Sequence, residues 1–158
     1  MDTLTPEQRH KNMSHIRSTN TSLEKSLRSQ LFRCGFRFRK NDARYEGKPD
    51  IVLPHYHAMI FVNGCFWHAH GCSKFVLPKT NTDFWKNKLE KNRERDEKTY
   101  SRLIDEGWRV CIVWECAITG RNKKDRLADA AEKIAWWLEE EPHELRVEIS
   151  DDADMIVC

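Results

Sequence analysis

Two near-continuous apolar runs stand in the middle of the chain, at residues 58–63 and 108–114. Runs of this length without polar alternation are typical of β-strands that are covered on both faces of a sheet. A shorter apolar segment, residues 50–53, directly follows Gly47-Lys-Pro49, and a proline favours an extended backbone beside it. We therefore predict three strands.

A helix is predicted to start at Thr21, because apolar residues then recur every three or four positions. Glu24, three residues further on, completes a capping box with this threonine. Leu27 and Leu31 continue the apolar face, and Gly35 is a candidate C-terminal stop.

Two further segments have the same helical spacing. The first covers residues 82–106 and is closed by Gly107, and the second covers residues 123–140 and ends before Pro142. The predicted order is therefore helix, two strands, long helix, strand, helix. This order describes an α/β domain with a mixed central sheet flanked by helices.

The chain has 158 residues, enough for one domain with its own core, and it contains no internal repeat or low-complexity linker. We expect a single domain over residues 1–158, with a basic N-terminal arm at 1–20 and an acidic tail at 142–158 that adds at most a short element. No apolar stretch approaches the roughly 20 residues that cross a bilayer, and the start lacks the apolar core of a signal peptide. We therefore expect a cytoplasmic protein with no membrane partner.

Charge is distributed unevenly, although the formal net charge is only +2. Residues 5–48 contain eleven Lys and Arg against four Asp and Glu, whereas residues 125–154 contain three against eleven. A basic first third is typical of a face that binds nucleic-acid phosphates. A solvated surface would give the same pattern, so charge alone opens the nucleic-acid hypothesis without proving it.

The densest chemistry is the segment Cys65-Phe-Trp-His-Ala-His70-Gly-Cys72, and Cys116 follows the third predicted strand. A reducing cytosol favours metal binding over disulfides, and a structural zinc site closes four tetrahedral positions with Cys and His. Cys65, His70, Cys72 and Cys116 would form such a Cys₃His site. The spacing alone does not decide between His68 and His70, nor does it exclude a catalytic zinc that holds a water.

Two other cysteines have a different interpretation. Cys34 and Cys111 fall within apolar patterns, so we interpret both as thiols of the hydrophobic core.

Several carboxylates occupy unusual positions. Asp50 opens an apolar strand, where a charge is costly unless it is paired or bound to a metal, although Pro-Asp alone is more often a turn signal. Asn92 and Asp96 interrupt the apolar face of the long helix. That interruption indicates either a solvated stretch or a polar cleft in which Asp96 orients His68. Glu24 is a third candidate acid beside the apolar face of its own helix.

These motifs occur together in one known family. They are Pro49-Asp50, Asn63-Gly-Cys-Phe-Trp-His-Ala-His-Gly-Cys72, Phe84-Trp85, Lys91-Asn-Arg-Glu-Arg-Asp96, and Gly107-Trp-Arg-Val with Val-Trp-Glu-Cys116. Over about residues 8–140 the chain resembles the very short patch repair (Vsr) DNA mismatch endonucleases. The resemblance implies a restriction-endonuclease-like fold with a structural zinc site. It also implies a nick 5′ of the thymine in T:G mismatches that arise when 5-methylcytosine deaminates, which initiates very short patch repair.

The resemblance further implies roles for individual residues. Asp50 and the backbone carbonyl of Val62 would bind a catalytic Mg²⁺. His68 would act as the base or activate the water, Asp96 would support it, and Glu24 would be an auxiliary acid.

The same resemblance assigns the zinc ligands and an aromatic wedge. The structural Zn²⁺ ligands would be Cys65, His70, Cys72 and Cys116, which selects His70 over His68. The wedge inserted beside the mismatch would be Phe66, Trp67 and Trp85, because a poorly paired step costs least to unstack. For Trp85, packing in the core explains the residue about equally well.

Two features depart from the family pattern. Val62-Asn63 stands where Thr-His is common; a valine still offers a backbone carbonyl, but Asn63 lacks the titratable imidazole that a phosphate contact or acid role would use. The second predicted strand also lacks the Glu-x-Lys half of the common nuclease motif, which is normal for this family.

The expected substrate is double-stranded DNA with a T:G mismatch, cut by a monomer in the bacterial cytoplasm and at the nucleoid when bound to DNA. Mismatch-repair proteins and a cytosine methyltransferase are the expected functional associates. Three alternatives remain open at this stage. They are a restriction-type nuclease that cuts both strands of matched DNA, a non-catalytic zinc DNA-binding protein, and a zinc hydrolase for a small substrate.

Overall fold

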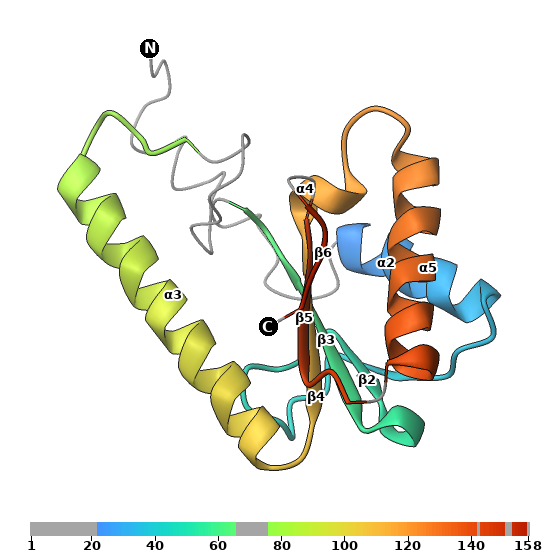
Figure 1. Cartoon of the computed structure of the whole chain (residues 1–158). Coiled ribbons are helices and arrows are strands. Elements are labelled where there is room, and N and C mark those ends of the chain that lie inside the picture. Colours follow the sequence, from blue (N-terminus) through green and yellow to red (C-terminus); the bar gives the residue numbers. More distant parts are fainter. Residues whose placement is uncertain (1–21, 66–75, 142, 151–152, 158) are drawn as a thin grey trace.

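A mixed β-sheet separates two helical layers (Figure 1). The computed structural model describes residues 22–65, 76–141, 143–150 and 153–157, with the backbone alone for the last range. In sheet order the strands are β1 (Arg39–Lys40), β2 (Ile51–Leu53), β3 (Ala58–Asn63), β4 (Arg109–Trp114), β5 (Arg146–Ser150) and β6 (Ala153–Val157). The central strands β3, β4 and β5 are parallel, and the remaining pairs are antiparallel.

The helices divide between the two faces of the sheet. Helix α3 (Thr82–Asp105) packs on one face, whereas α2 (Ser22–Arg33) and α5 (Lys123–Glu140) pack on the other (Figure 1). Two short elements, the 3₁₀ helix η1 (Pro54–Tyr56) and helix α4 (Glu115–Ile118), lie in the connections that follow β2 and β4. The sequence prediction of an α/β domain with a mixed sheet flanked by helices is confirmed.

Two hydrophobic cores explain the unbroken apolar runs. In β3, Met59 and Phe61 join the core under α3, while Ala58 and Ile60 join the core under α2 and α5. β4 alternates in the same way, and all six of its residues are buried. A strand covered on both faces needs apolar side chains at successive positions, as the sequence indicated.

The predicted strands and helices agree with the structure to within one or two residues. The stop of the long helix at Gly107 is also confirmed, since this glycine has φ +97°. Its N–H donates to the Ile104 carbonyl at 2.9 Å, and the N–H of Trp108 donates to the Leu103 carbonyl at 3.0 Å. Such bonds satisfy carbonyls that a helix end leaves open. The threonine of the predicted capping box, Thr21, lies outside the described residues.

The prediction for the acidic tail is wrong. Residues 142–158 were expected to add at most a short element, but β5 and β6 extend the sheet beyond β4. Val147 and Ile149 are buried in the core under α5, while Arg146 and Glu148 are only partly covered. This alternation is a strand pattern of period two, placed in a segment whose net charge suggested a solvated tail.

The interpretation of Cys34 as a core thiol is also wrong, because Cys34 is exposed. Helix α2 ends at Arg33, and the chain turns at Gly35 with φ +98°. Cys34 therefore leaves the face on which Leu27 and Leu31 are buried. Cys111, by contrast, is fully buried and the core interpretation is confirmed for it.

The loop before β2 passes very close to α3. Gly47 has φ +78°, and a Cβ at this position would lie 2.6 Å from Cγ2 of Thr99. Only glycine fits both the backbone conformation and this approach.

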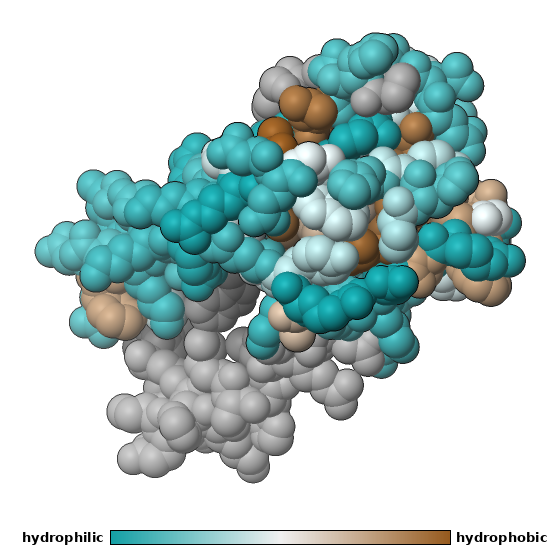
Figure 2. Space-filling model, turned by 90° about the horizontal axis from the view of Figure 1, so that it is seen from below, coloured by the Kyte–Doolittle hydropathy of each residue, from teal (hydrophilic) through white to brown (hydrophobic). Residues whose placement is uncertain are grey.

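Seen from below, the end of the molecule that carries the turn from α3 to β4 is largely hydrophilic, with small hydrophobic patches (Figure 2). Within the described residues, no helix has the combination of length and apolar character that spanning a membrane requires.

Candidate active site

Asp50 lies at the head of β2 with only 8% of its surface exposed. Its Oδ2 accepts a hydrogen bond of 2.6 Å from the backbone N–H of Val62 in β3. The N–H of Asp50 in turn donates to the Ile60 carbonyl at 3.1 Å. The β2–β3 hairpin therefore fixes the carboxylate at the peptide of Val62, the second residue that the resemblance assigned to metal binding.

Glu24 projects from the first turns of α2 to the same place and is 3% exposed. Its Oε2 accepts a hydrogen bond of 3.2 Å from the Asn41 side chain. It also faces the guanidinium of Arg28 at 3.5 Å, and the same Nη1 of Arg28 lies 3.5 Å from the Asp50 carbonyl. Asn41, which the sequence analysis did not single out, connects the loop before β2 to this acid.

Glu24 perturbs the carboxyl group of Asp50. Burial raises the pKa of Asp50 to about 8, against the pull of the Val62 N–H, and the charge and hydrogen bonding of Glu24 raise it further. Arg28 acts in the opposite direction but only weakly. Two buried carboxylates with this little positive charge nearby favour either a shared proton or a bound cation. Oxygen ligands of this kind suit a hard divalent ion such as Mg²⁺.

Asp96 lies on the half-buried inner face of α3, as its spacing predicted. Its Oδ1 is 3.5 Å from a guanidinium nitrogen of the exposed Arg95. Burial raises the pKa of Tyr100, and the charge of Asp96 adds to that rise. His68, which Asp96 was predicted to orient, lies outside the described residues, so their pairing stays a prediction.

Asn63 is buried, with 5% of its surface exposed. Its side-chain Nδ2 donates a hydrogen bond of 2.7 Å to the hydroxyl of Tyr100 on α3. The phenol ring also contacts Phe61 edge-on at 5.0 Å and has the guanidinium of Arg146 at 5.2 Å from its centre. Asn63 thus joins the end of β3 to α3, a role that sequence reasoning missed because nothing local to Asn63 identifies a partner 37 positions away.

Two of the four predicted zinc ligands are described, and they lie together. Cys65 and Cys116 are each 1% exposed and belong to the same core cluster. The strand register explains this, since Asn63 pairs with Trp114 and each cysteine follows two residues later. His70 and Cys72 lie outside the described residues. Among the residues that are described, no group of three or more His, Cys, Asp or Glu side chains could hold a metal.

The aromatic candidates are described only in part. Phe66 and Trp67 lie outside the described residues. Trp85 is half-buried, contacts Phe84 edge-on at 5.4 Å, and has the Lys88 ammonium 5.7 Å from its ring centre. Phe84 is 58% exposed, so this aromatic pair at the start of α3 is open to solvent.

The fold and the site define a mixed α/β protein with a buried pair of acids at the head of a β-hairpin. The sequence model of the family described as DNA mismatch endonuclease Vsr matches residues 1–74. The DNA mismatch endonuclease Vsr of Escherichia coli (strain K12) is 48% identical over 132 residues, which cover 82% of this chain and 83% of that protein. The chain therefore belongs to the Vsr family of DNA mismatch endonucleases, as its motifs predicted.

Two further relatives are nicking enzymes. Type II nicking enzyme V.XorIIP of Xanthomonas oryzae pv. oryzae is 47% identical, over 75% of this chain and 87% of the relative. Type II nicking enzyme V.NmeAIP of Neisseria meningitidis serogroup A is 48% identical, over 77% of this chain and 86% of the relative.

Proposed function

We propose that the protein is a magnesium-dependent endonuclease that nicks one strand of duplex DNA 5′ of the thymine in a T:G mismatch and so initiates very short patch repair. The observation that carries the proposal is the buried pair of Asp50 and Glu24 in a chain 48% identical to a DNA mismatch endonuclease. The antiparallel β2–β3 hairpin beside α2 is the arrangement expected of a restriction-endonuclease-like fold, which we assign to this domain.

The acid pair supports a magnesium site. One oxygen of Asp50 is held by the Val62 N–H, and burial together with the neighbouring Glu24 raises the pKa of Asp50, so a bound cation would stabilise its ionised form. Asp50 and the Val62 carbonyl would hold the ion, with Glu24 beside them. When bound, Mg²⁺ would polarise the scissile phosphate and stabilise the leaving oxygen.

The remaining residues would position the attacking water. His68 would accept its proton, and Asp96 on the inner face of α3 would hold the imidazole in the productive orientation. Asn63 takes no part as an acid in this scheme, because an amide does not titrate and its N–H₂ group is committed to Tyr100.

The buried thiols of Cys65 and Cys116 support a structural zinc site completed by His70 and Cys72. Two thiols in one core cluster at the ends of paired strands are suited to a closed tetrahedral site. Such a site would fix the segment that carries His68 and the wedge residues Phe66 and Trp67. Trp85 would complete the wedge, since its position beside the exposed Phe84 leaves it accessible to a base step.

The enzyme would act as a monomer in the bacterial cytoplasm, on DNA of the nucleoid, alongside mismatch-repair proteins. Its flanking sequence preference would follow that of an associated cytosine methyltransferase. A panel of T:G duplexes with different flanking sequences tests this link. Equal nicking rates for all flanking sequences would refute it.

Catalysis is tested by nicking of a T:G duplex with Mg²⁺ by the wild-type protein, by Asp50→Asn, and by Asp125→Asn as a control. Asp125 is exposed on α5 and lies outside the acid pair. We expect loss of nicking by at least about 10³-fold in Asp50→Asn only, which corresponds to about 4 kcal/mol of transition-state stabilisation. If Asp50→Asn nicks as fast as the wild type, the nicking comes from a contaminating nuclease. The protein would then be a non-catalytic zinc DNA-binding protein. Turnover with Zn²⁺ alone would favour the zinc hydrolase.

A further inference from the structure

A groove of about 590 Å³ runs between α2 and α5, on the face of the sheet opposite to α3. Its lining includes Lys25, Ser29, Gln30 and Arg33 from α2, and Lys123 and Lys124 from α5. We call this surface the α2–α5 groove. Neither the acid pair nor the predicted zinc site accounts for it.

The groove gathers positive charge without compensation. Its lining contains four cations and no acidic residue. Within the part of the chain that the structure describes, none of these four cations forms an ion pair. Like charges held side by side repel one another, so the arrangement favours an anionic ligand.

A second basic surface shows what a compensated arrangement looks like. On α3, a smaller groove of about 270 Å³ also has four cations in its lining, but Glu46 and Glu94 stand among them. Glu46 accepts a hydrogen bond of 2.7 Å from Arg102 there. The α2–α5 groove therefore differs from this surface in having four cations and no acid in its lining.

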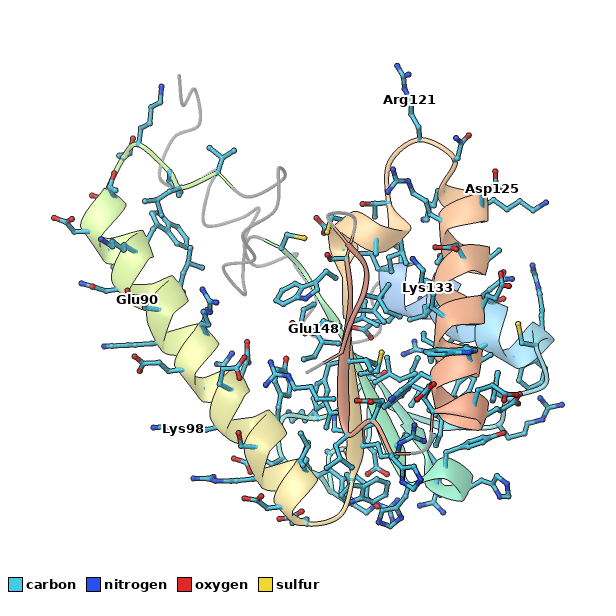
Figure 3. The ribbon with its side chains drawn as sticks, viewed as in Figure 1. Glu90, Lys98, Arg121, Asp125, Lys133 and Glu148 are labelled. Carbon is cyan, nitrogen blue, oxygen red and sulfur yellow. The ribbon has the colours of Figure 1, made fainter. Side chains whose placement is uncertain are left out.

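The α2–α5 groove begins beside the acid pair. Lys25 directly follows Glu24 on α2, so the near edge of the groove is about one helix diameter, roughly 10–12 Å, from the buried acids. Its other wall is the first turn of α5, which lies at the same end of the molecule as the carboxyl ends of β3 and β4 (Figure 1). Arg121 projects from the loop before α5 at this end (Figure 3).

The dimensions suit a polynucleotide strand. From Lys25 to Arg33 the helix advances about 12 Å, at 1.5 Å per residue. Along the duplex axis one DNA strand places a phosphate about every 3.4 Å, so a groove of this length can contact more than one phosphate. The N-terminal end of α5 adds the partial positive charge of its dipole, and the side chain of its N-cap residue Asn122 makes no capping bond. An acidic protein segment fits less well, since the lining has no aromatic anchor and Leu127 is its one apolar residue.

We propose that the α2–α5 groove binds the sugar–phosphate backbone of the duplex that flanks the nicking site. The inference rests on the proposed function, because it needs DNA at the acid pair. The groove contributes affinity and register along the duplex, and it is indifferent to the mismatch because phosphates carry no sequence information.

The test is the salt dependence of duplex binding by Lys25→Gln/Lys124→Gln, measured by fluorescence anisotropy without Mg²⁺. The matched control is Lys133→Gln, which removes a lysine from the same helix α5 outside the groove, where it pairs with Asp129 at 2.9 Å. Counterion release predicts that the slope of log K against log salt falls by about 0.9 per lost contact. At 0.1 M salt the affinity then falls about 8-fold for one lost contact and about 60-fold for two.

The loss should be equal for a T:G duplex and its T:A counterpart, and Lys25→Arg/Lys124→Arg should restore binding. Thermal unfolding of each variant separates lost contacts from a lost fold. A groove variant that binds DNA with the slope and affinity of Lys133→Gln would overturn the inference, as would a loss confined to the mismatched duplex. Because binding is measured without cleavage, a protein that binds through the groove but nicks nothing would contradict the proposed function alone.

Discussion

Replacing Asp50 with asparagine should stabilise the protein at neutral pH in the absence of Mg²⁺, although it removes the central acid of the site. The side-chain oxygen of asparagine can still accept the hydrogen bond of 2.6 Å from the Val62 N–H. Its N–H₂ group can donate toward Glu24, in place of the proton that Asp50 holds when its carboxyl group is neutral. The substitution therefore exchanges a carboxyl group that must either stay protonated or bury a charge in the folded protein for a neutral hydrogen-bonding group of the same shape.

The magnitude follows from the raised pKa. The pKa of Asp50 is about 8 in the folded protein, against its ordinary value of about 3.8 in the unfolded chain. Between these pH values the folded protein holds a proton that the unfolded chain has released, so stability falls as pH rises through this window. From pH 4 to pH 7 the limit is about 4 kcal/mol, at 1.36 kcal/mol per pH unit. We expect about 2–4 kcal/mol, because side-chain relaxation and water entry reduce the cost of a buried charge.

Urea unfolding of wild type and Asp50→Asn at pH 5 and pH 7 measures this effect. The buffer should contain neither Mg²⁺ nor a chelator, since a chelator would also remove structural zinc. We expect the stability advantage of the variant to grow from pH 5 to pH 7, while the exposed control Asp125→Asn stays within about 0.5 kcal/mol of wild type. Added Mg²⁺ should stabilise the wild type and not the variant. The reasoning would be refuted if the variant were less stable than wild type at pH 7. It would also be refuted if the stability advantage of the variant were the same at pH 5 and pH 7.

Three further outcomes are expected. Cys65→Ser and Cys116→Ser should each abolish the retention of one zinc per chain after dialysis and lower the melting temperature, as metal analysis and calorimetry would show; full zinc content in both would remove these cysteines from the ligand set. Gly47→Ala should cost about 1–3 kcal/mol in urea unfolding, because its Cβ would lie 2.6 Å from Thr99 Cγ2. Adding Thr99→Ser, which lacks that methyl group, should recover part of the lost stability. If nothing is recovered, the whole cost comes from the backbone conformation at Gly47. Tyr100→Phe should cost about 1–2 kcal/mol in the same assay, because it leaves a buried amide without its 2.7 Å acceptor; an unchanged stability would show that water replaces the hydroxyl.

The sequence predicted the elements whose pattern is long and local. Residues 58–63 and 82–106 carry enough periodic or continuous apolar character to define β3 and α3 to within a residue. Strand β5 was missed because only Val147 and Ile149 mark its buried side, among charged residues that also suit a solvated tail. Its position beside β4 depends on a long crossover through α5, which no local pattern contains.

The site was predictable where a residue conflicts with its surroundings. A charge at the head of a buried strand pointed to Asp50, which lies buried beside Glu24 in the structure, and a polar interruption of an apolar helix face pointed to Asp96, whose role stays a prediction. Glu24 was explained by a capping box, whereas in the structure it is buried with Asn41 and Arg28 beside Asp50. Contacts of this kind join separate elements, so they follow from the packing of α2 against the sheet and not from spacing along the chain.

The central claim is mismatch-directed nicking, and strand-specific mapping of the nick tests it most directly. Two duplexes that differ only in T:G against T:A, labelled on each strand in turn, are incubated with the protein and Mg²⁺. We expect one nick, 5′ of the mismatched thymine and on that strand only, with no comparable cleavage of the T:A duplex. Equal cleavage of both duplexes, or cuts in both strands, would contradict the account and favour a restriction-type nuclease.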